Sequence, residues 1–449
     1  SETLILPQNY TAILDRKRTQ QAIKFLKDSF ERELAKALHL DRVSAPLFVH
    51  PNSGLNDNLN GVERPVQFDV ANSDETLEIV HSLAKWKRQA LAEYGYSAGE
   101  GIYTDMNAIR RDETPDNLHS IYVDQWDWER VISPTERNTE TLHTIVQRIW
   151  SSIKSVEWLL CNRFPEIKPE LPNEIAFITS QELLDRYPTL APKQRENAIA
   201  REKGAIFIAQ IGKTLSDGTK HDGRAPDYDD WELNGDILVW YAPLQCAIEL
   251  SSMGIRVDPT TLMRQLQAAH CTERASLPFH RKLRDDLLPQ TIGGGIGQSR
   301  LCLVLLKKAH IGEVQASFWP ESMRKTAKMQ ASTYSNPHTR RIRLAYKPPA
   351  RATATMIDFC RAIAFGNTRF YRAISLRSIR AFIAYLARWA QYGLLSRYFA
   401  ALNTRSCARA LPLGRQSATR FALFRYAQYG LLSRYCLWQY ALLSRYFAA

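Results

Sequence analysis

The sequence predicts an α+β fold, in which a mainly antiparallel sheet is flanked by helices. Two observations predict it. Short segments rich in Ile, Val, Phe, Tyr and Trp recur through the first 300 residues, and segments with helical periodicity fall between them. We find no internal repeat before residue 330, and no linker that would divide this part of the chain. We therefore expect residues 1–330 to form one domain.

The first elements follow from apolar spacing and turn residues. Residues 17–38 form a helix, because apolar residues stand four apart at 22, 26, 30, 34 and 38. The stretch 43–49 is a strand in which Pro46 favours an edge or an interface. Strands at 65–70 and 76–80 surround a polar turn, and Ser82 is the expected N-cap of a helix that reaches Tyr94.

The segment 121–131, IYVDQWDWERV, alternates like a half-buried strand. Gln125, Asp127 and Glu129 fall on one face, whereas Trp126 and Trp128 fall on the other. Charges are unfavourable beside such aromatic residues unless they are paired or meet a ligand. The pattern therefore indicates either a binding site or a structural ion-pair network, and periodicity alone does not choose between them.

The remaining elements are read in the same way. Helices are expected at 139–161, 193–203 and 259–269, and strands at 176–180, 205–211, 236–241 and 248–253. Near residue 293 three glycines precede Gly297 and a helix that opens at about Ser299. Such a cluster permits close backbone approach to a ligand, but by itself it is more often a tight turn. Its spacing matches neither a Walker loop nor a GxGxxG motif.

The charge of the chain is unevenly distributed. From residue 331 onward there are 19 Lys and Arg but a single acid, so this tail carries +18 and the preceding residues carry −5. The tail repeats AQYGLLSRY-like segments rich in Arg and Tyr, and we do not expect a packed domain there. We expect no leader peptide, no membrane span and a cytoplasmic protein, because long apolar runs are missing and the seven cysteines are scattered.

Several motifs together resemble a known family. Three segments resemble, in chain order, the three motifs of class II aminoacyl-tRNA synthetases: the helix–strand–proline unit at 17–46, GIYTDMNAIRRDE (101–113) and GGGIGQSR (293–300). HSLAKWKRQ (81–89), SAGEGIYT (97–104), RAPDYDDW (224–231) and ELSSMGIRVD (249–258) narrow the resemblance to asparagine synthetase A, the ammonia-dependent aspartate ligase. It covers residues 15 to 325. One departure is local: a single residue stands between Trp231 and Leu233, where bacterial members carry a short loop.

The resemblance implies a fold and a reaction. The fold is a class II synthetase-like catalytic domain, with residues 331–449 as an irregular extension. Aspartate, ATP and ammonia would give asparagine, AMP and pyrophosphate through β-aspartyl-AMP. No cysteine precedes Cys161, so an N-terminal glutaminase is not expected and free ammonia is the nitrogen donor. The motif at 17–49 implies a homodimer.

The resemblance also assigns roles to residues. The expected catalytic residues are Lys87, Arg110, Asp127 and Asp229. Aspartate would be bound by Asp57, Ser82, Lys87, Gln125, Asp127, Asp229 and Ser252. ATP would be bound by Arg110, Ser120, Arg256, Gly295 and Arg300, and Mg²⁺ by Asp236 and Glu249. How the work is divided among Asp57, Asp127 and Asp229 stays open.

A second interpretation belongs to another functional class. The body would be an inactive synthetase-like protein, and the basic tail would bind RNA. We favour the ligase, because Lys87, Arg110, Asp236, Glu249 and Arg300 are all present. The tail itself is more simply explained as read-through of repetitive sequence.

Overall fold

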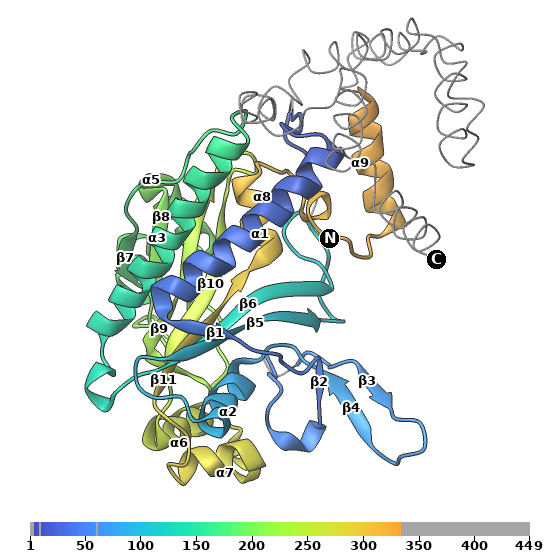
Figure 1. The fold of residues 1–449 in the computed structure, drawn as a ribbon. Helices are drawn as coiled ribbons and strands as arrows, with labels where there is room; N and C mark the ends of the chain where they lie inside the picture. Colours follow the sequence, from blue (N-terminus) through green and yellow to red (C-terminus); the bar gives the residue numbers. More distant parts are fainter. Residues whose placement is uncertain (1–3, 9, 60–61, 334–449) are drawn as a thin grey trace, which may run out of the picture. The chain divides into compact units, whose positions relative to one another are not determined.

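The computed structural model describes residues 4–8, 10–59 and 62–333. The predicted tail, 331–449, lies almost wholly outside the described residues. A large sheet organises the described part (Figure 1), and its strand order is β1-β5-β6-β11-β10-β9-β8-β7. The bounds of these strands are β1 Leu40–Arg42, β5 Gly101–Ile109, β6 Tyr122–Val131, β7 Ala176–Thr179, β8 Ala205–Ala209, β9 Asp229–Tyr241, β10 Cys246–Arg256 and β11 Thr291–Gly297.

The expected mainly antiparallel sheet is only partly right, because the sheet is mixed. The inner pairs, from β5 to β8, are antiparallel, but β1 pairs with β5 in parallel and β7 pairs with β8 in parallel. Parallel neighbours require long crossover connections. Here α4 (Ser180–Arg186) and α5 (Pro192–Lys203) connect β7 to β8, and the chain from 43 to 100 connects β1 to β5.

A smaller antiparallel sheet lies beside the large one, in the order β2-β4-β3. Its strands are β2 Phe48–Val49, β3 Gln67–Asp69 and β4 Thr76–Ile79. The strand expected at 43–49 is thus wrong as a single element. Its residues connect β1 to β2, and Pro46, which lacks an N–H to donate, stands between them.

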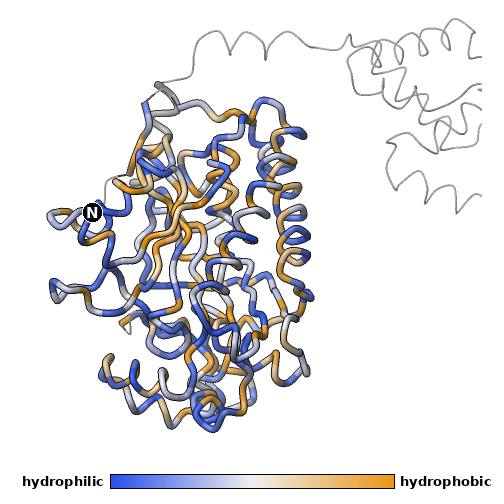
Figure 2. Tube along the Cα trace, turned by 90° about the vertical axis from the view of Figure 1, so that its left-hand side faces the viewer, coloured by the Kyte–Doolittle hydropathy of each residue, from blue (hydrophilic) through white to orange (hydrophobic). Residues whose placement is uncertain are grey.

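One face of the large sheet holds the main core. Helices α1 (Arg16–Leu38) and α3 (Thr139–Arg163) pack side by side across it, and α8 (Gln298–Leu305) joins them (Figure 1). The helix predicted at 17–38 is confirmed, and all five of its periodic apolar residues are fully buried. Phe30 packs on Trp126, with ring centroids 4.6 Å apart. Figure 2 shows the resulting concentration of hydrophobic residues inside the body and hydrophilic ones along the loops.

The opposite face carries Gln125, Asp127 and Glu129 of β6, whereas Asp124 lies on the core face and pairs with Lys27 of α1. Helix α2 (Ala84–Tyr94) packs there on β5, β6 and β11, whereas α5 packs on β8, β9 and β10. Helices α6 (Pro259–Ala268) and α7 (Pro278–Arg284) pack on one another beyond the end of the sheet, and α9 (Glu321–Thr333) ends the described part. No helix of the described residues has the length and apolarity needed to cross a membrane.

Two local expectations are corrected. The glycine run is not a tight turn but strand β11, which hydrogen-bonds to β6 on one side and β10 on the other. Ser82 is not the N-cap of α2, since Leu83 holds that position without a side-chain cap. The Ser82 hydroxyl instead donates to Asp57 Oδ2 at 3.1 Å.

Candidate functional site

Four residues form a row across the middle of the large sheet. Asp127 on β6 pairs with Gly295 on β11, Gly295 pairs with Ser252 on β10, and Ser252 pairs with Asp236 on β9. Residues paired in antiparallel strands point to the same face. The register therefore brings residues more than 100 positions apart to one face, the face opposite Trp126 and Trp128.

Gly295 leaves room in the middle of this row for side chains of the neighbouring strand β6. A Cβ on Gly295 would lie 2.5 Å from Gln125 Oε1 and 2.7 Å from Asp127 Oδ1, closer than a real Cβ allows. The position therefore needs glycine so that the Gln125 amide and the Asp127 carboxylate can lie directly over the β11 backbone. The close approach observed at Gly295 is made by two side chains of β6, and the approach of a ligand there stays a prediction.

A bulge in β10 adds Glu249 to the same face. Ser252 pairs with Asp236, and Glu249 pairs with Leu238. Three residue steps on β10, from Glu249 to Ser252, therefore lie opposite two residue steps on β9, from Leu238 to Asp236. Without the extra residue, Glu249 and Ser252 would point to opposite faces. Burial raises the pKa of Asp236 to about 6, with Arg224 opposing and Glu249 adding to the rise. The two carboxylates expected at a metal site are therefore brought together.

Lys87 reaches this face from α2 and is fully buried. Its Nζ donates to the Gly294 carbonyl at 2.9 Å and lies 3.4 Å from Asp127 Oδ2. Burial lowers the pKa of Lys87, and Asp127 and Glu129 only partly offset this effect. A lysine and a carboxylate that the sequence places 40 residues apart thus form one buried pair.

Asp57 lies beside α2 in a separate hydrogen-bond cluster. Its Oδ2 accepts from Ser82 and from the Tyr228 hydroxyl at 3.2 Å, and its Oδ1 accepts from the Leu59 amide. His81 Nδ1 contacts the Asp57 carbonyl at 3.0 Å. Asp57 is thus more than a turn residue, since it connects the loop before β3 to the segment that carries Asp229.

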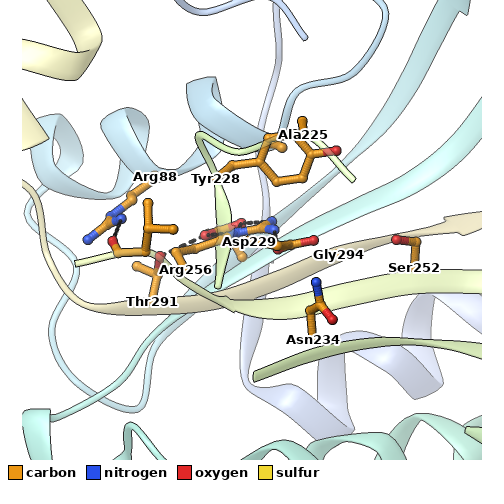
Figure 3. A network of polar contacts seen from close by, with 12 residues as sticks. Arg88, Ala225, Tyr228, Asp229, Asn234, Ser252, Arg256, Thr291 and Gly294 are labelled. Carbon is orange, nitrogen blue, oxygen red and sulfur yellow. Dashed lines mark hydrogen bonds and ion pairs between the residues drawn. The ribbon is translucent and has the colours of Figure 1, made fainter. Parts of the chain in front are cut away.

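Arg256 lies at the centre of a buried ion-pair network (Figure 3). Its Nε and one terminal nitrogen donate to Glu129, the second at 2.6 Å, and its other terminal nitrogen pairs with Asp229. Thr291 donates to Glu129 at 2.7 Å, and the guanidinium lies over the Tyr228 ring. Burial would lower the pKa of Arg256, but Glu129 and Asp229 outweigh it and raise the pKa.

This network changes the expected role of Arg256. All three guanidinium nitrogens face protein carboxylates, and the residue is 2% exposed. The arrangement matches a structural ion-pair network, one of the two interpretations that the sequence pattern of β6 allowed. Arg256 is therefore better described as a positioning residue than as an ATP ligand. Burial raises the pKa of Asp229 despite Arg256.

The loop from 110 to 121 contributes Arg110 and Ser120. Arg110 follows β5 and is half-buried. Among the described residues its guanidinium donates one long hydrogen bond, to the His81 carbonyl at 3.4 Å, and its Nε has no partner. Ser120 is buried and shares a hydrogen bond with Ser317. The guanidinium of Arg110 therefore has donors left for a ligand, whereas Ser120 is partly engaged by the protein.

Arg300, in the first turn of α8, lies near the start of β10. One of its terminal nitrogens lies 3.5 Å from Glu249 Oε2 and donates to the Glu249 carbonyl at 3.2 Å. Burial would raise the pKa of Glu249, but Arg300, Arg224 and Lys193 outweigh it and lower the pKa. Glu249 is thus surrounded by cations from three segments.

Sequence reasoning missed Arg224, Tyr228 and Glu129 as site residues. Arg224 donates to Asp236 at 2.6 Å and also to Ser252, so it lies between two predicted ligand contacts. Arg224 and Tyr228 belong to the motif RAPDYDDW, which pointed to this segment without assigning them roles. Glu129 was recognised as an unusual charge on β6, but its partner Arg256 could not be inferred from spacing.

Known proteins resemble this chain in sequence over most of its length. The family model described as aspartate–ammonia ligase matches residues 17–331. The chain belongs to the aspartate–ammonia ligase family. Two relatives named aspartate–ammonia ligase, from Ruminiclostridium cellulolyticum and Clostridium tetani, are 61% and 60% identical. The matches cover 72% and 74% of this chain and 96% and 98% of those relatives.

Solved structures support the fold of this family member. Asparaginyl-tRNA synthetase from Entamoeba histolytica matches with a TM-score of 0.50 and 14% identity, over 67% of each chain. The Pyrococcus horikoshii asparaginyl-tRNA synthetase, solved with asparaginyl-adenylate, also has a TM-score of 0.50 and 14% identity, over 68% of this chain and 70% of that one. The expected class II synthetase-like architecture is thereby confirmed. The matched region of the ligase ends close to where the basic tail begins.

Proposed function

We propose that this enzyme converts aspartate, ATP and ammonia into asparagine, AMP and pyrophosphate, through β-aspartyl-AMP. The observation that carries the proposal is the row Asp127–Gly295–Ser252–Asp236, which gathers polar side chains of β6, β10 and β9 beside a glycine position of β11. Family membership supports the substrates aspartate and ammonia. A site of this kind suits a reaction that depends on positioning and on neutralising charge.

The nucleotide would lie over β11. We assign the α-phosphate to Arg110, which has free donors, and the distal phosphates to Arg300 beside Glu249. Gly295 would give the ligand access to the sheet, and Ser120 would border the nucleotide. Arg256 is better assigned to holding Glu129 and Asp229 in place than to contacting ATP.

The amino acid would bind between α2 and the centre of the sheet. Lys87 is the partner for the α-carboxylate of aspartate, and Asp127, which lies 3.4 Å from it, is a partner for the ammonium group. Asp57, held by Ser82 and Tyr228, and Asp229, held by Arg256, are the further carboxylates for the ammonium group and for ammonia. Gln125 and Ser252 would orient the substrate by hydrogen bonds.

Asp236 and Glu249 are the residues that would hold Mg²⁺. The described residues contain no cluster of three or more His, Cys, Asp or Glu suited to a metal ion. Two carboxylates on one face nevertheless fit Mg²⁺, which commonly binds one or two carboxylates together with substrate phosphates. When bound, the ion would neutralise charge on the phosphates. Arg224 would have to release Asp236 for this purpose.

The reaction then proceeds in two displacements. An oxygen of the aspartate side-chain carboxylate bonds to the α-phosphorus while the bond to pyrophosphate breaks. Arg110 would hold the oxygens of the phosphoryl group, where negative charge is greatest. Ammonia next bonds to the acyl carbon, AMP departs with the electron pair, and the nitrogen loses a proton to a nearby carboxylate.

The test is asparagine formation by the purified full chain. Aspartate, ATP, Mg²⁺ and ammonium chloride should give asparagine and pyrophosphate in equal amounts, and the rate should rise toward alkaline pH as more free ammonia is present. Glutamine should not replace ammonium. Formation of ADP and phosphate instead of AMP and pyrophosphate would refute the adenylate route.

A further inference from the structure

Lys193 lies in the first turn of α5, near the proposed distal-phosphate site. It belongs to none of the sequence motifs that predicted this site. Its side chain is 69% exposed, and its Nζ lies 2.7 Å from Glu196 Oε2. Glu196 is itself buried and contacts His221 Nε2 at 3.2 Å. The lysine therefore stands on a well-anchored turn, yet its ammonium group remains accessible.

Helix α5 is attached to the strand that carries Glu249. The Asn197 side chain accepts a hydrogen bond from the Ala247 amide at 2.7 Å, and Ala247 precedes Glu249 on β10 by two residues. This bond fixes the first turns of α5 beside the start of β10. Burial lowers the pKa of Lys193, but Glu196 and Glu249 outweigh it and raise the pKa, while Arg300 opposes them. Lys193 thus interacts electrostatically with both Glu249 and Arg300.

Cations from three separate segments consequently surround Glu249: Arg300 from α8, Arg224 from the loop before β9, and Lys193 from α5. These cations pair with Glu249, Asp236 and Glu196, and Asp229 and Asp222 act on the same cluster. Asp236 and Glu249 are the proposed Mg²⁺ ligands. With the ion bound to Asp236 and Glu249, these carboxylates would be neutralised, and the neighbouring cations, Lys193 included, would attract a polyanion.

We propose that Lys193 binds the β- and γ-phosphates of ATP, and the pyrophosphate that is released, together with Arg300. The inference rests on the proposed function, because it takes the nucleotide to lie over β11. It adds a residue of α5, an element outside the synthetase-like motifs, to the nucleotide site. It also assigns the two ends of the triphosphate to different residues, because Arg110 would hold the α-phosphate and Lys193 the β- and γ-phosphates.

Two probes separate these ends. Pyrophosphate carries the distal phosphates alone, and AMP carries the α-phosphate alone, so the affinity of each is measured by calorimetry on the full chain in Mg²⁺ buffer. In Lys193→Met the Kd of pyrophosphate should rise about tenfold, the usual effect of losing a charge-assisted hydrogen bond. The Kd of AMP should stay unchanged. In turnover, KM for ATP should rise while KM for aspartate does not.

Matched variants exclude a structural explanation. Lys193→Arg should retain most pyrophosphate binding. Lys203→Met removes the same charge at the other end of α5, about 15 Å away at 1.5 Å per residue, and should leave both ligands unaffected. Equal pyrophosphate affinity in wild type and Lys193→Met would overturn the inference, as would an equal loss of AMP affinity. A wild type that forms no asparagine would instead refute the proposed function.

Discussion

The Arg224 guanidinium donates to the Asp236 carboxylate at 2.6 Å, and both side chains are largely buried. The pKa of Asp236 stays raised to about 6, because burial and the neighbouring Glu249 outweigh the effect of Arg224. The ion pair thus offsets only part of the cost of ionising the Asp236 carboxyl group. An ionised Asp236 is thus unfavourable for the ligand-free protein, although the proposed function requires it. Such a conflict between stability and function is typical of an active site.

Asp236→Asn should therefore stabilise the protein while removing its activity. The folded-state pKa is about 6 and the ordinary value is 3.8, so between these pH values the folded protein binds more protons than the unfolded chain. Stability then falls as pH rises from about 4 to 6, and the variant should lack this fall. At pH 7 the gain is at most roughly 3 kcal/mol. Thermal melting across pH 4–8 measures it, with the exposed Asp74→Asn as control. A variant less stable than wild type at pH 7 would contradict the argument.

Arg110→Ala should lower the rate of adenylation by about 100- to 1,000-fold, the range for removing one donor that meets transition-state charge. Its fold should persist, because within the described residues the Arg110 side chain makes one long hydrogen bond to a carbonyl. Pyrophosphate release measures the effect. The neighbouring Arg111 is exposed, so Arg111→Ala should stay close to wild type. Near-normal turnover of Arg110→Ala would exclude the assignment.

Arg256→Met should unfold the protein more easily rather than weaken ATP binding selectively. The change leaves Glu129 and Asp229 buried without their cation, and breaking such a pair costs about 3–5 kcal/mol. Urea unfolding measures it. Arg264→Ala, in which the lost side chain is 63% exposed, is the control and should change little. Wild-type stability combined with lost ATP affinity would return Arg256 to the nucleotide site.

The predicted homodimer needs a different basis from the one the sequence offered. The homodimer was inferred from the motif at 17–49, but the apolar stripe of α1 within this motif is buried inside a single chain. Leu47 and Phe48 remain 48% and 44% exposed and adjoin the same motif. Phe48→Glu should therefore convert a dimer into a monomer in light scattering. Trp158→Glu, at an exposed site on α3, should not. A monomeric, fully active wild type would refute the dimer.

Truncation after Thr333 should leave fold and ligase activity intact, since every assigned residue lies between Asp57 and Arg300. The removed residues carry +18, so any RNA binding by the full chain should be non-specific, weaken steeply with salt and disappear on truncation. Filter binding at several salt concentrations tests this. Sequence-selective binding near physiological salt would favour the RNA-binding alternative, and lost ligase activity would place part of the active site in the tail.

Elements governed by local periodicity could be predicted from the sequence. The four-residue spacing of α1 depends on neighbours in the chain, so its buried face was foreseen correctly. The alternation of β6 predicted which side chains share a face, but the strand is not half-buried, because Asp127 and Glu129 are as buried as Trp126 and Trp128. The helices predicted at 139–161 and 193–203 also match α3 and α5 closely. The catalytic role and the site assignments came from motifs, not from periodicity.

The sequence by itself therefore determined the strongly periodic elements, the family and the segments that carry the site. Only the tertiary structure decided which charges meet. The bulge in β10 turns Glu249 toward Asp236, the β10–β11 register leaves Gly295 between Asp127 and Ser252, and Arg256 is enclosed by Glu129 and Asp229. Each of these depends on pairing between strands distant in sequence, where a shift of one residue reverses the face of every side chain.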